Sequence, residues 1–266
     1  MKIGYGGVDI CIFASGLGCY CSLEKNHDAF DFIKRRVLRI GPTWWCFLVF
    51  FTGFQVISYG VSLRTIMGNF LGVQYFTGIG NPFNWYIYGV LLLYIFAPYL
   101  KELVDRIATN REHLLVLIVL IAYSVVFWRS NHMIIIITRF VVFYLGMILG
   151  KACKKELTLP RKTIFGLLLL AVFGGVILKL FYIKCSDFLW DYGLHWYPFV
   201  LIVPGLCIFI SYLMCTFENN KAKSAIEKLL SLIGKNSLEV YLVHLLAFEM
   251  IGVLMKEGTI GASNFL

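Results

Sequence analysis

The sequence predicts an all-α polytopic membrane protein, a single helical bundle of about eight transmembrane helices spanning residues 1–266. Two features of its composition support this fold class: 59% of the residues are hydrophobic and 15% are charged. Soluble domains have about 45–50% apolar and about 25% charged residues, so a soluble fold could not cover this much apolar surface. The third observation is that the apolar runs approach the roughly 20 residues needed to cross a bilayer.

Eight apolar segments qualify as candidate spans. They cover about 6–23, 41–59, 84–100, 113–128, 134–150, 163–183, 197–215 and 235–255. The stretch 60–83 is apolar but interrupted by polar residues and glycines, so we expect an interfacial or re-entrant segment there. In the third span, Trp85 and Tyr88 are expected to anchor the helix in an aromatic belt near the outer face.

The Lys and Arg counts of the connecting loops alternate along the chain. Loops 24–40, 101–112, 151–162 and 216–234 together contain 16 of these residues, and the intervening loops contain 3. The positive-inside rule places the rich loops in the cytoplasm and both termini outside. The net charge of +9 is therefore distributed as in loops beside a bilayer, and we predict membrane lipid rather than nucleic acid as its partner. The eight cysteines lack metal-binding spacing, so no metal site is predicted.

Two charged residues lie within predicted spans, Asp9 in the first and Arg139 in the fifth. A charge at membrane depth is costly, and such residues usually face the protein interior, where they pair with one another or with a ligand. Pairing of Arg139 with Asp9 and binding of a ligand both remain open. Ser15 lies in a row of small residues, with Cys11 and Cys19, that suits close helix packing.

A dense cationic cluster precedes the second span. Arg36 and Arg39 are three residues apart and share a face on a helix, and Arg35 neighbours Arg39 at a spacing of four. Guanidinium groups bind phosphates with two parallel hydrogen bonds. The cluster therefore has two interpretations: a topology signal that contacts anionic lipid, or a docking site for a phosphorylated cofactor.

The last span places polar side chains on one helical face, Ser237, Tyr241 and His244, followed by Phe248, and we expect Ser237 and Tyr241 to be buried. His113 lies at the boundary of the fourth predicted span, and His244 is the only histidine in the interior of a predicted span. It is a weak candidate for a general base, and a structural role is the alternative.

Five fragments in this order resemble the acyltransferase 3 family of integral membrane O-acyltransferases. They are GVDICIFASGL at 7–17, RRVLRIGP at 35–42, WYIYGVLLLYIFAP at 85–98, RFVVFYLGMILG at 139–150 and SLEVYLVH at 237–244. The resemblance implies transfer of an acyl group, commonly acetyl, from acyl-CoA as co-substrate to a hydroxyl of a cell-surface polysaccharide or a lipid-linked glycan. It implies no bound cofactor, a bacterial plasma membrane location, and acyl-donor binding by Arg36 and Arg39.

The chain departs from the family pattern at its N-terminus. Family members carry, before the GVD stretch, a first span with an arginine and a histidine regarded as the catalytic base, whereas here only six residues precede that stretch. We therefore expect residues 1–266 to be an N-terminally truncated domain that is catalytically incomplete, or a degenerate member of the family. A different class of function remains open: a non-enzymatic carrier or flippase for a glycan precursor, with Asp9, Arg139 and His244 along a polar path.

Overall fold

A computed structural model describes residues 5–71, 85–126, 131–154, 161–184, 194–216 and 221–256. Every element in these ranges is helical, which confirms the predicted all-α class. The elements are α1 (Tyr5–Lys25), α2 (Ala29–Tyr59), α3 (Leu63–Leu71), α5 (Trp85–Arg106), α6 (Asn110–Val126), α7 (Asn131–Ile137), α8 (Arg139–Lys154), α9 (Arg161–Lys184), a 3-10 turn η2 (Leu194–Trp196), α11 (Pro198–Thr216), α12 (Lys221–Lys235) and α13 (Ser237–Lys256).

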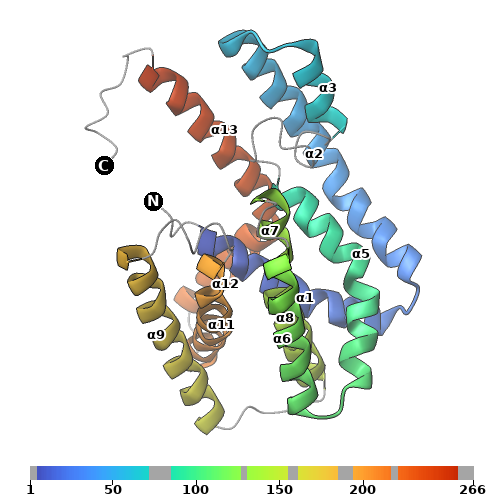
Figure 1. The fold of residues 1–266 in the computed structure, drawn as a ribbon, viewed down its shortest axis with the longest axis vertical. Helices are drawn as coiled ribbons and strands as arrows, with labels where there is room; N and C mark the ends of the chain where they lie inside the picture. The colour runs from blue at the N-terminus through green and yellow to red at the C-terminus, as the bar shows by residue number, and fades with distance from the viewer. Residues whose placement is uncertain are drawn as a thin grey trace. The chain divides into compact units, whose positions relative to one another are not determined.

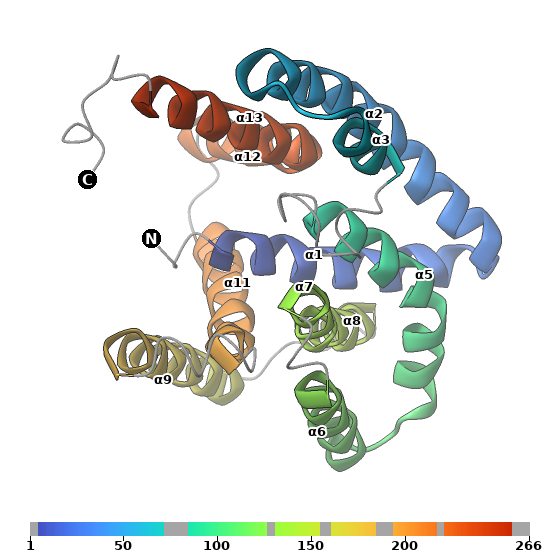
Figure 2. The same cartoon turned by 45° about the horizontal axis from the view of Figure 1, so that its top comes forward.

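The chain forms two compact units. The first contains residues 1–36 and 85–216, and the second contains residues 37–84 and 217–266. Within the first unit, α1 packs against α8 and α9 packs against α11. Figure 1 shows α9 beside α11, and Figure 2 shows α1 passing over the end of α8.

Glycines allow α1 and α8 to approach backbone to backbone. A methyl group at Gly16 would overlap the carbonyl oxygen of Phe143, and one at Gly146 would overlap the carbonyl oxygen of Phe13. Small residues permit this packing between membrane helices. The predicted row of small residues on α1 is not this contact surface: Ser15 is half-buried, because the helix presents the neighbouring Gly16 to α8 instead.

The second unit contains a helical hairpin and a bent helix pair. The α3 helix lies back against α2, where buried Asn69 donates a 3.0 Å hydrogen bond to the side-chain oxygen of Gln55 and Trp45 stacks near Phe70. Nine residues of helix extend about 14 Å, so α3 is too short to cross a bilayer. The rest of the predicted interfacial segment, 72–84, lies outside the described residues.

Among the described residues, six helices are long and apolar enough to cross a membrane, or up to seven if the bent pair α12–α13 counts as one span. This is fewer than the eight predicted from apolar runs. The predicted fourth span is α6, which has only 17 residues, and the eighth is α13, which joins α12 at a 69° bend. Helix α12 was assigned to a loop, although its residues form a continuous helix.

The cationic cluster is helical and not part of a loop. Helix α2 begins at Ala29, continues through Pro42 and ends at Tyr59, so the arginines and the predicted second span belong to one helix of 31 residues. A helix of this length extends about 46 Å, whereas the hydrocarbon core is about 30 Å thick. The first turns of α2, which carry Arg35, Arg36 and Arg39, therefore extend beyond the hydrocarbon when the apolar part spans it.

Candidate functional site

The two intramembrane charges form a buried ion pair. Arg139 Nε lies 3.1 Å from Asp9 Oδ1, and each residue is 1% exposed. Arg139 Nη1 also donates to the carbonyl oxygen of Ile135 at 3.0 Å and to Thr138 Oγ1 at 3.2 Å. The structure thus shows the Asp9 pairing that the sequence analysis left as one of two alternatives.

The position of the pair follows from the α1–α8 contact. Asp9 lies seven residues before Gly16, and Arg139 lies seven residues before Gly146. The contacts then advance together along both helices to Tyr20 and Gly150, so the two helices run in the same direction. Seven residues make two turns, which returns each charged side chain to the face that carries its glycine.

Two tryptophan rings enclose the guanidinium group of Arg139. Its Cζ lies 4.9 Å from the ring centroid of Trp85, at the start of α5, and 4.0 Å from that of Trp196, in η2. Cation–π contacts of this kind are worth about 2 kcal/mol when desolvated. Trp85 is 7% exposed, so the prediction that it anchors α5 in a head-group belt is wrong: the ring covers a buried charge. Tyr88 is half-buried.

The enclosed pair joins the starts of four helical elements of the first unit: α1, α5, α8 and the η2–α11 segment. Asp9 Oδ2 is buried and has no hydrogen-bond partner among the described residues. A buried carboxylate oxygen that accepts no hydrogen bond is unfavourable, so this atom can accept a bond from a polar group entering the site.

A second feature lies at the opposite end of α1, where it meets α2 and α5. A cavity of about 500 Å³ opens there, and both apolar and polar residues line it. The apolar lining includes Leu23, Ile33, Ile95 and Pro98, and the polar lining includes His27, Lys101, Glu102 and Asp105.

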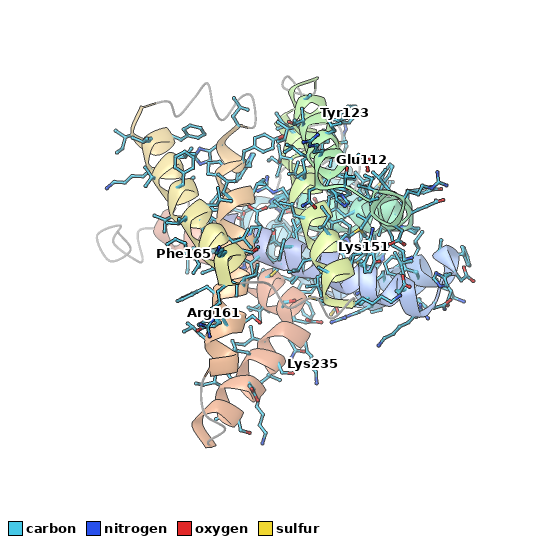
Figure 3. The ribbon with its side chains drawn as sticks, turned by 90° about the horizontal axis from the view of Figure 1, so that it is seen from below. Glu112, Tyr123, Lys151, Arg161, Phe165 and Lys235 are labelled. Carbon is cyan, nitrogen blue, oxygen red and sulfur yellow. The ribbon has the colours of Figure 1, made fainter. Side chains whose placement is uncertain are left out.

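Buried and half-buried polar groups order this end of the first unit. Lys101 Nζ lies 2.7 Å from Asp105 Oδ2 and 2.9 Å from Glu24 Oε2, and Tyr20 donates a 2.7 Å hydrogen bond to Asp105 Oδ1. Lys151, labelled on α8 in Figure 3, donates to the carbonyl oxygen of Val104 at 2.6 Å. These contacts fix the ends of α1, α5 and α8 around the cavity.

Arg36 lies beside this cavity. It shares one face of α2 with the lining residues Ala29 and Ile33, at spacings of seven and three residues. Its guanidinium carbon lies 5.2 Å from the ring centroid of Tyr94 on α5 and 5.3 Å from that of Phe32. Among the described residues, no carboxylate forms an ion pair with Arg36, so its charge is held by aromatic faces and stays open to an anion.

The other two arginines of the cluster have different contacts. Arg35 forms a 2.7 Å ion pair with Asp31, and both side chains are largely exposed. Arg39, in the second unit, donates a 3.3 Å hydrogen bond to the carbonyl oxygen of Lys235. The three arginines predicted to bind a donor therefore do not share one set of contacts, although they lie within two turns of one helix.

The polar face predicted on the last span exists on α13, but it is not buried. The His244 ring packs edge-to-face against Tyr241 and Phe248, with centroids 5.3 and 5.6 Å away. His244 is exposed, and Ser237 and Tyr241 are half-buried, whereas the sequence analysis expected Ser237 and Tyr241 to be buried. The difference arises because α13 contacts few other elements of its unit.

Comparison with known proteins identifies the family. The acyltransferase 3 family model, described as an acyltransferase domain, matches residues 3–264. The chain belongs to the acyltransferase 3 family. No match was found among curated proteins or among solved structures. The match extends through both compact units of this membrane acyltransferase, and it confirms the resemblance drawn from the five sequence fragments.

Several residues around the buried ion pair and the α1–α8 contact were not predicted from the sequence. Trp196 and His195 were assigned to an outer loop, yet both are buried, with Trp196 against Arg139. Gly16 was overlooked beside the row of small residues. The Gly146–Gly150 spacing is a recognised signal for close helix packing and would have identified α8 as the partner helix.

Proposed function

We propose that this acyltransferase moves an acyl group, most simply acetyl, from acyl-CoA to a hydroxyl of a cell-surface polysaccharide or a lipid-linked sugar. The observation that carries the proposal is the family match over residues 3–264. The membrane-spanning helices are consistent with a multi-pass protein of a bacterial cytoplasmic membrane, where a cytoplasmic donor and an envelope acceptor meet.

The cavity at the end of α1 and Arg36 are the proposed donor site. Acyl-CoA combines phosphates with an acyl thioester. The apolar lining of the cavity suits the acyl chain, whereas its polar lining includes Glu102 and Asp105 beside Lys101, so we assign the phosphates to Arg36 outside the cavity. Arg36 presents a guanidinium group that no described carboxylate neutralises, which suits bidentate contact with phosphate. Arg39, one turn further along α2, extends the cationic surface in our proposal.

The transfer itself is a substitution at the thioester carbonyl. The acceptor hydroxyl oxygen forms a new ester bond to the carbonyl carbon, the carbon–sulfur bond breaks, and CoA leaves as the thiol with the proton released by the hydroxyl. A positioned base that takes this proton contributes typically 10²- to 10⁴-fold. The Asp9–Arg139 pair serves in our proposal to hold α1, α5, α8 and η2 in register.

The proposal is tested with the chain in native membrane vesicles supplied with radiolabelled acetyl-CoA. Label should appear in an alkali-labile ester in the polysaccharide or glycolipid fraction, because O-acetyl groups are removed by mild base. Vesicles lacking the chain are the control. Transport of a labelled glycan precursor without any transfer of acetyl would instead indicate a carrier.

A further inference from the structure

Helix α12 has an apolar side formed by large residues that are all exposed. They are Ile226, Leu229, Leu230, Leu232 and Ile233. With about 100° of rotation per residue, these five positions fall within one half of the helix circumference. A helix with one apolar half and one polar half stabilises itself by burying the apolar half.

The opposite side of α12 is polar and cationic. The helix sequence has four lysines against one glutamate. Ser224, Lys228, Ser231 and Lys235 follow one another at spacings of four, three and four residues. They line one shallow depression of about 450 Å³ together with Glu227 and Leu232, so two lysines face one carboxylate there. Two ammonium groups and two hydroxyl groups therefore face one small volume, which suits phosphate oxygens (Lys235 is labelled in Figure 3).

The bend between α12 and α13 determines how α12, with its apolar half, is oriented relative to the membrane plane. The two helices make an angle of 69°, and α13 is the more apolar of the pair. If α13 crosses the bilayer, α12 is closer to the membrane plane than to its normal. The bend is held from α2, where Arg39 donates to the carbonyl oxygen of Lys235 and Thr43 donates to Glu239.

We propose that α12 is an interfacial helix that binds the surface of an anionic membrane. Its apolar half enters the boundary between head groups and acyl chains, and Lys228 and Lys235, with Ser224 and Ser231, contact lipid phosphates. The excess of lysine complements anionic lipid head groups. Because α12 is continuous with α13, and the two helices together count as one candidate span, α12 stays at the bilayer in every state of the protein.

The test is amide hydrogen exchange, followed by mass spectrometry, on the full chain in lipid nanodiscs. One set contains phosphatidylcholine alone and the other contains phosphatidylcholine with phosphatidylglycerol. We expect the amides of α12 to exchange more slowly in the anionic nanodiscs, by roughly fivefold for each lysine that contacts the surface. High salt should remove this difference, because it screens exposed charges.

Matched variants separate the two halves of the helix. Lys228→Gln with Lys235→Gln should abolish the slowing caused by the anionic lipid, while Lys162→Gln with Lys179→Gln on α9 removes the same charge and should preserve it. Leu229→Ser with Ile233→Ser should speed exchange of α12 in both lipids, with unchanged exchange in α1 and α8 showing that the protein is folded. Equal exchange of α12 in the two lipids would overturn the proposal. Slowing that appears only when CoA is added would overturn it too and assign the lysines to the donor.

Discussion

Asp9 and Arg139 are each placed two helical turns before the glycine through which their helices touch, and their side chains meet at 3.1 Å. The pairing therefore depends on the backbone contact of Gly16 with Phe143 and of Gly146 with Phe13. The charges are enclosed by Trp85 and Trp196, so the ion pair, the glycine contact and the aromatic cover form one unit of structure.

Removing one charge of the pair should destabilise the protein more than removing both. Asp9→Leu leaves Arg139 buried without its carboxylate, and breaking a buried ion pair in this way costs about 3–5 kcal/mol. The double variant Asp9→Leu with Arg139→Leu should recover much of that loss, because no uncompensated charge remains. The fraction of monodisperse protein after heating, measured by size-exclusion chromatography in detergent, reports the order of stability. A double variant no more stable than Asp9→Leu would contradict the account.

Arg139→Lys should not substitute for arginine. Lysine retains the charge, but it lacks the flat guanidinium group that lies between two indole rings and donates to the Ile135 carbonyl oxygen. We expect a lower thermal transition than in the wild type, together with a change in tryptophan fluorescence, since Trp85 and Trp196 lose their cation. A Trp85→Phe variant, which keeps a weaker aromatic face, should be closer to the wild type.

The close contact of α1 with α8 can be tested by comparing two glycine-to-alanine variants, one inside the contact and one outside it. Gly146→Ala should destabilise the protein by about 1–3 kcal/mol, because the added methyl overlaps the carbonyl oxygen of Phe13 and the two backbones must separate. Gly18→Ala on α1 meets nothing within 4 Å and should be neutral or slightly stabilising, since alanine favours the helix. Thermal stability in detergent distinguishes them, and equal losses would show that α1 and α8 do not depend on this contact.

The sequence predicts the structure best at the two buried charges, because an unpaired charge inside a membrane is energetically costly. Two charges inside apolar segments must be neutralised, so Asp9 and Arg139 were recognised at once as candidates for a pair. The sequence does not predict that Trp85 and Trp196 enclose Arg139. Their positions depend on how α5 and η2 approach α8 in the folded chain, and no short sequence pattern indicates this. The predicted second span begins at about residue 41, next to Pro42, but α2 begins at Ala29 and continues through this proline. The lysines of α12 are typical of a loop beside the bilayer, whereas its apolar residues recur with the period of an amphipathic helix.

The loop charges predict the orientation of the acyltransferase in the membrane. Reporter tags inserted at Lys155 and Ala222 should be cytoplasmic, and tags at Tyr75 and Trp190 should be external, because the Arg- and Lys-rich loops stay on the cytoplasmic side. Cysteine-labelling or enzyme-reporter fusions measure this directly. A cytoplasmic signal at Trp190 would reject the orientation, and with it a cytoplasmic entrance to the cavity beside Arg36.

Arg36 should matter more for donor binding than its neighbour Arg35. Arg36→Ala removes a guanidinium group that no described carboxylate neutralises, and hydrogen bonds to charged groups are worth roughly 1.5–3 kcal/mol, about 10- to 150-fold in affinity. Arg35→Ala removes the same charge, but Arg35 is already paired with Asp31, so its effect should be small. Arg36→Lys should restore binding only in part, because lysine lacks the planar guanidinium group that donates two parallel hydrogen bonds to one phosphate. Equilibrium dialysis with labelled acetyl-CoA measures all three, and equal losses at both positions would leave the cluster as a general electrostatic signal.

The most direct test of acyl transfer is to follow both products at once in proteoliposomes that contain purified chain, acetyl-CoA labelled in the acetyl group and a glycolipid or polysaccharide extract. The account predicts that labelled ester and free CoA thiol appear together in equal amounts, and that both decrease in Arg36→Ala at low donor concentration. Thiol release without ester formation would indicate hydrolysis. The absence of both products from proteoliposomes in which the chain binds acetyl-CoA would contradict acyl transfer by residues 1–266, and it is the result expected if this domain lacks the catalytic base of the family.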